Sequence, residues 1–204
     1  MQYENERRLE KLVNDLVDDF VRQNRAAQTM KRLLDEAGVG IRPVVDHITV
    51  RTMDVDKRAK EFTALGYVEG ERLEYNNWWA KVYRKPGYPA LFIDQAFDGE
   101  RGKGAVIPPW VKKFGDRTLH HVAVQVNDIE FAIAQLKKHG VECTGQIVGE
   151  RGGPLRQIFT APEKRDGEPF SVLELAERHF GFAGFAPPQA DGLMQSTVAG
   201  AKKA

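Results

Sequence analysis

The chain has 204 residues, a formal net charge of +1 from 30 basic and 29 acidic residues, and one cysteine. This length is enough for a substantial hydrophobic core in one globular unit or two fused half-units. The balanced charge gives no electrostatic reason to expect nucleic acid or a membrane surface as a partner. No apolar run approaches the roughly 20 residues of a transmembrane helix. The N-terminus lacks the apolar core of a secretory signal, and the single Cys143 excludes an internal disulfide, so we expect a cytoplasmic protein.

The first predicted element is helical and runs from residue 4 to about residue 37. Apolar residues recur there at spacings of three and four, which is the pattern of an amphipathic helix. Asn24 and Arg25 indicate a break, and Gly38 and Gly40 end the pattern. We interpret residues 1–43 as a helical extension that serves as a structural cap or as a homodimer surface.

Residues 44–98 are predicted to form a β-α-β-β-β module. The first strand covers about 44–52, and a helix follows with Asp54 as its N-cap and Gly66 after its last residue. Turn-forming residues then separate three strand-like runs. These runs cover residues 67–74, 78–84 and 90–97.

The same order of elements returns after a connector at residues 99–118, which contains a short helical piece at 110–114. The second module covers residues 119–178, with a strand at 119–126 and a helix to residue 139 that is capped by Asp128. Its other strands are expected at about 142–149, 155–160 and 169–176, with a charged loop at 163–168. The tail at 179–204 is predicted to cover an opening. The expected fold is therefore of the α+β class, with two tandem modules forming a curved mixed sheet around a metal site.

The first strands of the two modules share one pattern of alternation. In the first, Ile48 and Val50 form an apolar face, and His47, Thr49 and Arg51 form a polar face. In the second, the polar face begins with His121, 74 positions after His47. A strand that lines a polar cavity would show this pattern, and its repetition indicates an internal duplication.

Two carboxylates fall in the last strands of the modules, after prolines that align them. Asp94 and Glu174 are 80 positions apart, so the second module has gained about six residues in this alignment. Imidazole and carboxylate groups are typical ligands of iron, manganese, nickel, cobalt and zinc. We predict His47, His121 and Glu174 as metal ligands and Asp94 as a possible fourth, since its shorter side chain reaches less far.

Each of these residues also has an ordinary structural interpretation. A single strand histidine is more often packed than metal-bound, and Glu174 could form a salt bridge with Arg178. Arg51 could pair with Asp46 or Asp54, and Gln157 could face solvent. The occurrence of several such groups at duplicated positions favours a metal site.

Several segments resemble a known family. The repeated modules with an inward histidine resemble the vicinal oxygen chelate superfamily over about residues 44–178. A narrower resemblance is to the 2-oxoadipate dioxygenase/decarboxylase (hydroxyglutarate synthase) family, which is related to 4-hydroxyphenylpyruvate dioxygenase. The segments that carry it are Asp46-His47-Ile48-Thr49-Val50-Arg51-Thr52, Gly66-Tyr67, Leu155-Arg156-Gln157, Glu174-Leu175-Ala176-Glu177-Arg178, and Gly184-Phe185 with Gln189 to Thr197.

This resemblance implies an Fe(2+) enzyme that uses O2 and a small 2-oxo acid similar to 2-oxoadipate, and releases CO2 and a 2-hydroxy acid. It places the family's metal ligands on His47, His121 and Glu174 and its substrate-carboxylate arginine on Arg51. Gln157 lies in a strand beside the predicted site and could donate to a substrate oxygen, so we assign Arg51 and Gln157 as catalytic candidates. Two alternatives remain open: a metal-dependent lyase, isomerase or epimerase with four protein ligands, and a small-molecule binding protein of the same fold.

Overall fold

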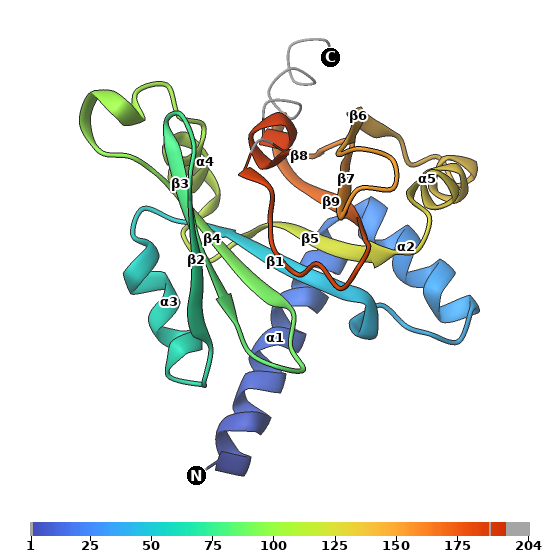
Figure 1. Cartoon of the computed structure of the whole chain (residues 1–204), viewed down its shortest axis with the longest axis horizontal. Coiled ribbons are helices and arrows are strands. Elements are labelled where there is room, and N and C mark those ends of the chain that lie inside the picture. Colours follow the sequence, from blue (N-terminus) through green and yellow to red (C-terminus); the bar gives the residue numbers. More distant parts are fainter. Residues whose placement is uncertain (1, 188, 195–204) are drawn as a thin grey trace. The chain divides into compact units, whose positions relative to one another are not determined.

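The computed structural model describes residues 2–187 and 189–194 (Figure 1). The chain forms two compact units: the residues up to Asp19 with His47–His120, and Phe20–Asp46 with the chain from His121 onwards. The predicted α+β class is confirmed, and so is the helical extension at the N-terminus. Among the helices of the described residues, none combines the length and apolar character that crossing a bilayer requires.

The N-terminal extension consists of two helices, α1 (Gln2–Gln23) and α2 (Arg25–Glu36). Asn24 separates them, as predicted, because its side-chain oxygen accepts a hydrogen bond from the backbone N–H of Ala27 at 2.9 Å and so caps α2. The Asn24 amide also donates to the Ser171 hydroxyl at 3.1 Å. The side chain is fully buried, so one residue both starts a helix and connects it to strand β9 (Glu168–Arg178).

The first unit contains a four-stranded half-sheet in the order β2-β3-β4-β1. Strand β3 is antiparallel to both neighbours, and β1 lies parallel to β4. Helix α3 begins at the predicted cap, because Asp54 accepts from Lys57 N at 2.9 Å, and it packs against β4. The bounds are Val45–Arg51 for β1, Val55–Thr63 for α3, Val68–Glu74 for β2, Trp78–Arg84 for β3 and Ala90–Ala96 for β4. A short 3-10 helix, Arg42–Val44, precedes β1.

The connector contains more helix than predicted. A 3-10 helix covers Gly99–Gly102, and α4 covers Ile107–Phe114 instead of residues 110–114. Pro108 and Pro109 lie in the first turn of α4, where a missing N–H costs nothing, so these prolines start the helix and do not delay it. Helix α4 packs against β4 of the same unit.

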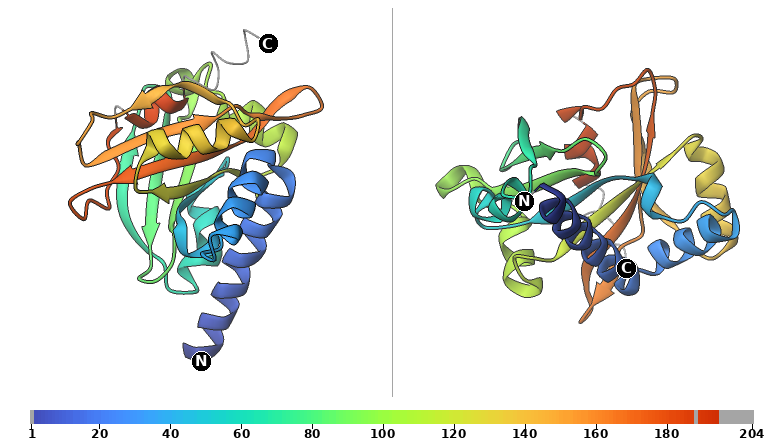
Figure 2. Two further views of the ribbon diagram at one scale, coloured as in Figure 1. Left: turned by 90° about the vertical axis from the view of Figure 1, so that its right-hand side faces the viewer. Right: turned by 90° about the horizontal axis from the view of Figure 1, so that it is seen from below.

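The second unit repeats the arrangement in the order β5-β9-β7-β6, with β5 parallel to β9 (Figure 2). Helix α5 packs against β9, and Asp128 caps it by accepting from Phe131 N at 2.7 Å. The bounds are Leu119–Val126 for β5, Ile129–Lys138 for α5, Cys143–Val148 for β6, Leu155–Thr160 for β7, Glu163–Arg165 for β8 and Glu168–Arg178 for β9.

The prediction of a charged loop at residues 163–168 is wrong in part. Residues 163–165 form strand β8, which pairs with the start of β9. Asp166 and Gly167 both have positive φ, 52° and 80°, as the central residues of a tight two-residue hairpin turn require. Strand β9 is therefore longer than the predicted 169–176.

The tail packs on the second unit as far as it is described. Residues 187 and 189–194 are helical, and Leu193 is 3% exposed in a cluster with Phe159 and Val172. Residues 195–204 of the predicted covering tail, which include part of the quoted resemblance, lie outside the described residues.

Candidate metal centre

The second unit places His121 and Glu174 beside each other without help from the rest of the chain. Strands β5 and β9 run parallel with Ala123 opposite Glu174, so the carboxylate stands two residues along from the histidine. His121 Nε2 lies 3.2 Å from Glu174 Oε2. Glu174 is 1% exposed, so its charge has been removed from water and depends on polar neighbours.

Gln157 is one of these neighbours. It lies in β7, and its Nε2 donates to Glu174 Oε1 at 2.5 Å. Both side chains are buried, so this hydrogen bond sets the rotation of the carboxylate and turns Oε2 towards His121. The role that the sequence predicted for Gln157, donation to a substrate oxygen, stays a prediction; the structure shows its amide engaged with Glu174.

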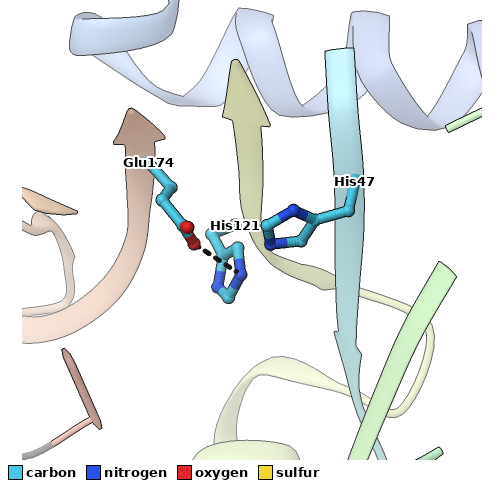
Figure 3. Close-up of side chains that lie close together, drawn as sticks. All are labelled: His47, His121 and Glu174. Atoms are coloured by element: carbon cyan, nitrogen blue, oxygen red, sulfur yellow. Dashed lines mark ion pairs between the residues drawn. The ribbon is translucent and has the colours of Figure 1, made fainter. Parts of the chain in front are cut away.

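His47 is the corresponding histidine of the first unit. It is 2% exposed on β1, and its ring centroid lies 6.5 Å from that of Phe92. One ligand atom from each of His47, His121 and Glu174 lies within 4.8 Å of the others (Figure 3). These three are the residues that the sequence singled out as metal ligands.

Asp94 does not occupy the position that the sequence alignment assigned to it. In β1 and β4, Thr49 is opposite Phe92 and Arg51 is opposite Asp94. The residue that matches Glu174, two along from the histidine, is therefore Phe92, and the predicted equivalence of Asp94 and Glu174 is wrong by two positions. Phenylalanine cannot bind a metal, and the close group found among the described residues does not include Asp94.

Asp94 instead faces Arg51 inside the first unit. Arg51 Nε lies 3.8 Å from Asp94 Oδ2, and both side chains are almost completely buried. Burial raises the pKa of Asp94 to about 7, against the opposing effect of Arg51. Burial also lowers the pKa of Arg51 to about 10, although Asp94 opposes this shift. The Arg51 guanidinium lies over the Trp110 ring, 5.5 Å from its centroid.

The salt-bridge partners that the sequence offered for Arg51 (Asp46 or Asp54) and for Glu174 (Arg178) interact with other groups. Arg178 holds Asp46 with two hydrogen bonds, Nε to Oδ2 at 2.6 Å and Nη2 to Oδ1 at 2.9 Å. It also donates to the carbonyl of Gly184 at 2.7 Å, which fixes the start of the tail. Asp54 caps α3. Sequence reasoning missed the Asp46–Arg178 pair, although Asp46 begins the segment that contains His47 and Arg178 ends the segment that begins with Glu174.

Aromatic side chains flank both histidines, and the sequence analysis did not single these out. Phe92 lies beside His47, and Phe159 lies beside His121 with ring centroids 5.1 Å apart. Phe92 is opposite Thr49 in the pair β1–β4, and Phe159 is opposite Glu174 in the pair β7–β9. Only the strand register shows these pairings. Cys143 is half-buried, and burial raises the pKa of its thiol, which agrees with an unreactive side chain.

A protein-family model matches residues 46–158 of the chain, more than half of its length. The chain belongs to the glyoxalase/bleomycin resistance protein/dioxygenase superfamily. A search of curated proteins found no match. Members of this superfamily bind divalent metals, and His47, His121 and Glu174 are of the residue types that such ions take as ligands.

Solved structures show the same fold at low sequence identity. A proposed hydrolase from Shewanella frigidimarina superposes with a TM-score of 0.75 and 22% identity, over 88% of this chain and 98% of that one. A proposed glyoxalase superfamily protein from Ralstonia eutropha gives 0.64 and 13%, over 87% and 85%. A mutant 4-hydroxymandelate synthase from Streptomyces coelicolor gives 0.59 and 16%, over 81% and 56%. At such identities the likeness concerns the fold alone.

Proposed function

We propose that the chain is a non-haem Fe(2+)-dependent decarboxylating dioxygenase that converts a small 2-oxo acid, comparable in size to 2-oxoadipate, into a 2-hydroxy acid. His47, His121 and Glu174 would hold the metal. The observation that carries the proposal is that these three buried groups bring their ligand atoms within 4.8 Å of one another.

The donor set fits such an ion. Two imidazoles and one carboxylate on one side of a metal form the facial triad of non-haem iron oxygenases, which leaves coordination positions open. Two ligand atoms that each lie about 2.1 Å from a shared ion are at most about 4.2 Å apart. The ligand atoms of His47, His121 and Glu174 lie within 4.8 Å of one another, which is close to that separation. Since the position equivalent to Glu174 in the first unit is Phe92, the register supports three protein ligands over the four that a lyase or epimerase would use.

In the proposed reaction, the C1–C2 bond of the 2-oxo acid breaks and C1 leaves as CO2. One oxygen atom of O2 completes the new carboxylate, and the other becomes the hydroxyl of the 2-hydroxy acid, so no further reductant is needed. His47, His121 and Glu174 would hold the iron, which would supply open positions for chelation by the 2-oxo acid and for O2 activation.

The residues of the chain would orient the reactants and exclude water. Gln157 holds the Glu174 carboxylate, and Phe92 and Phe159 provide apolar walls beside the histidines. Arg51 stands on the same strand face as His47, about 13 Å along the strand, and its long side chain could meet the far end of a short acid.

The test is oxygen uptake by anaerobically purified protein that is loaded with Fe(2+) and mixed with a panel of 2-oxo acids. We expect one CO2 and one 2-hydroxy acid for each O2 consumed. His47→Ala and Glu174→Ala should abolish turnover and weaken metal binding measured by calorimetry. His139→Ala, which removes an exposed histidine, should change neither.

Absence of turnover with every acid of a broad panel, in protein shown to hold Fe(2+), would refute the proposal. Proton exchange at the carbon beside a substrate carboxyl, without oxygen uptake, would instead identify an isomerase or epimerase.

A further inference from the structure

The first unit contains a second group of buried polar atoms on the strand face that carries His47. Asp94 and Trp78 are 1% and 4% exposed. Neither Asp94 Oδ1 nor Trp78 Nε1 has a hydrogen-bond partner within the described residues. Leaving a buried acceptor and a buried donor unsatisfied costs about 1–3 kcal/mol each, so both atoms are expected to have a partner that the chain itself does not supply.

The strand register places the Asp94 and Trp78 side chains on one face of the sheet as diagonal neighbours. Asp94 is opposite Ala80 and Trp78 is opposite Ala96 in the antiparallel pair β3–β4, so all four side chains share one face. The two alanines are the cross-strand neighbours, and their methyl groups leave the aspartate and the indole as the large polar side chains of this patch. The Trp78 ring is fixed in place by stacking on Tyr75, with ring centroids 3.8 Å apart.

The charged side chains of this group are Asp94 and Arg51. Arg51 lies opposite Asp94 in the parallel pair β1–β4, with a guanidinium nitrogen 3.8 Å from the carboxylate. When Asp94 is ionised, a ligand carboxylate on Arg51 would bring a second buried negative charge next to it, and like charges in a buried site repel strongly. A hydroxyl or a carboxamide meets no such penalty, because it can donate to Asp94 Oδ1 and accept from Trp78 Nε1.

We propose that Asp94, Trp78 and Arg51 form a subsite that binds a neutral hydroxyl or carboxamide at the far end of the 2-oxo acid. This inference rests on the proposed function and deepens it by naming the substrate class. It departs from the resemblance, in which Arg51 binds a far carboxylate. Asp94 is then the residue that sets specificity, since it converts a site for an anion into a site for a neutral donor and acceptor.

The experiment compares 2-oxo acids of one chain length that end in a carboxamide, a carboxylate or a methyl group. With the Fe(2+)-loaded protein, we expect kcat/KM for the carboxamide to exceed that for the other two by about 10- to 100-fold, because a site built to hydrogen-bond a group rejects analogues that lack it. Asp94→Asn should reverse the order of carboxamide and carboxylate. Trp78→Phe should raise KM for the carboxamide about tenfold and leave kcat unchanged.

Trp79→Phe is the matched control. Trp79 is the next residue of β3, points to the opposite face and stacks against Arg72, with the guanidinium 4.2 Å from the ring centroid. This variant should keep the wild-type preference. A wild-type preference for the carboxylate, or a preference that neither Asp94→Asn nor Trp78→Phe alters, would overturn the proposal and assign the two unsatisfied atoms to a structural water.

Tryptophan fluorescence separates this proposal from the proposed function. Carboxamide and carboxylate acids are titrated into the protein in the absence of O2, and the part of the change in tryptophan emission that Trp78→Phe removes gives their dissociation constants at this subsite. If no 2-oxo acid is turned over but the carboxamide still binds about tenfold more tightly in a manner that depends on Asp94, the function fails and the subsite stands. Equal binding of the two acids refutes the subsite whether or not the protein is an enzyme.

Discussion

Replacing Gln157 with leucine should weaken metal binding without unfolding the protein. The Gln157 amide donates at 2.5 Å to a carboxylate that is 1% exposed. A hydrogen bond to a charged group contributes about 1.5–3 kcal/mol, which corresponds to about 10- to 150-fold in a binding constant. This agrees with the 10- to 100-fold that removal of a residue supporting a metal ligand typically costs. We therefore expect the dissociation constant for Fe(2+) to rise by about 10- to 100-fold.

The assay is anaerobic calorimetry with Fe(2+), alongside thermal melting to verify that the variant is folded. Gln146→Leu serves as the control, because Gln146 is an exposed glutamine in the neighbouring strand β6 and its loss should change metal affinity by less than about twofold. A folded Gln157→Leu variant that binds Fe(2+) as tightly as the wild type would refute the assignment of Gln157 as the residue that positions the carboxylate.

Three further predictions concern stability. Asn24→Ala removes the cap of α2 and should lower the free energy of unfolding by about 1–3 kcal/mol in urea denaturation; a loss below about 0.5 kcal/mol would contradict the capping role. Asp46→Asn leaves the Arg178 side chain, which is 9% exposed, without its ionised partner and should cost about 3 kcal/mol, and an unchanged melting temperature would show that the pair contributes nothing. The raised pKa of Asp94 means that the folded state binds a proton more tightly than the unfolded state, so its contribution to stability is present below about pH 4 and is lost as the pH rises through 7. The stability of the wild type should therefore decline relative to Asp94→Asn between pH 4 and pH 7, and parallel pH profiles would refute the shift.

Local signals predicted most of the elements. Asn24, Asp54 and Asp128 were recognised as a break and two caps because a side-chain oxygen there satisfies helix N–H groups within three residues along the chain. The strands followed from alternation, which depends only on neighbouring residues. The errors lie where one local pattern is compatible with two structures. Pro108-Pro109 can either end or start a helix, and here it starts one. Asp166-Gly167 forms a hairpin turn inside an expected loop.

The amino-acid sequence by itself determined the duplicated modules and the identity of three candidate ligands, because alternation along a strand places a side chain on one face whatever the strand pairs with. It could not determine the register between β1 and β4. A shift of two residues keeps every side chain on its own face, so the pattern of Pro89 to Asp94 fits either alignment. Only the tertiary structure showed that Phe92 stands where Glu174 stands in the other unit, and that Asp94 is the partner of Arg51, since backbone hydrogen bonds between strands distant in the chain decide which residues face each other.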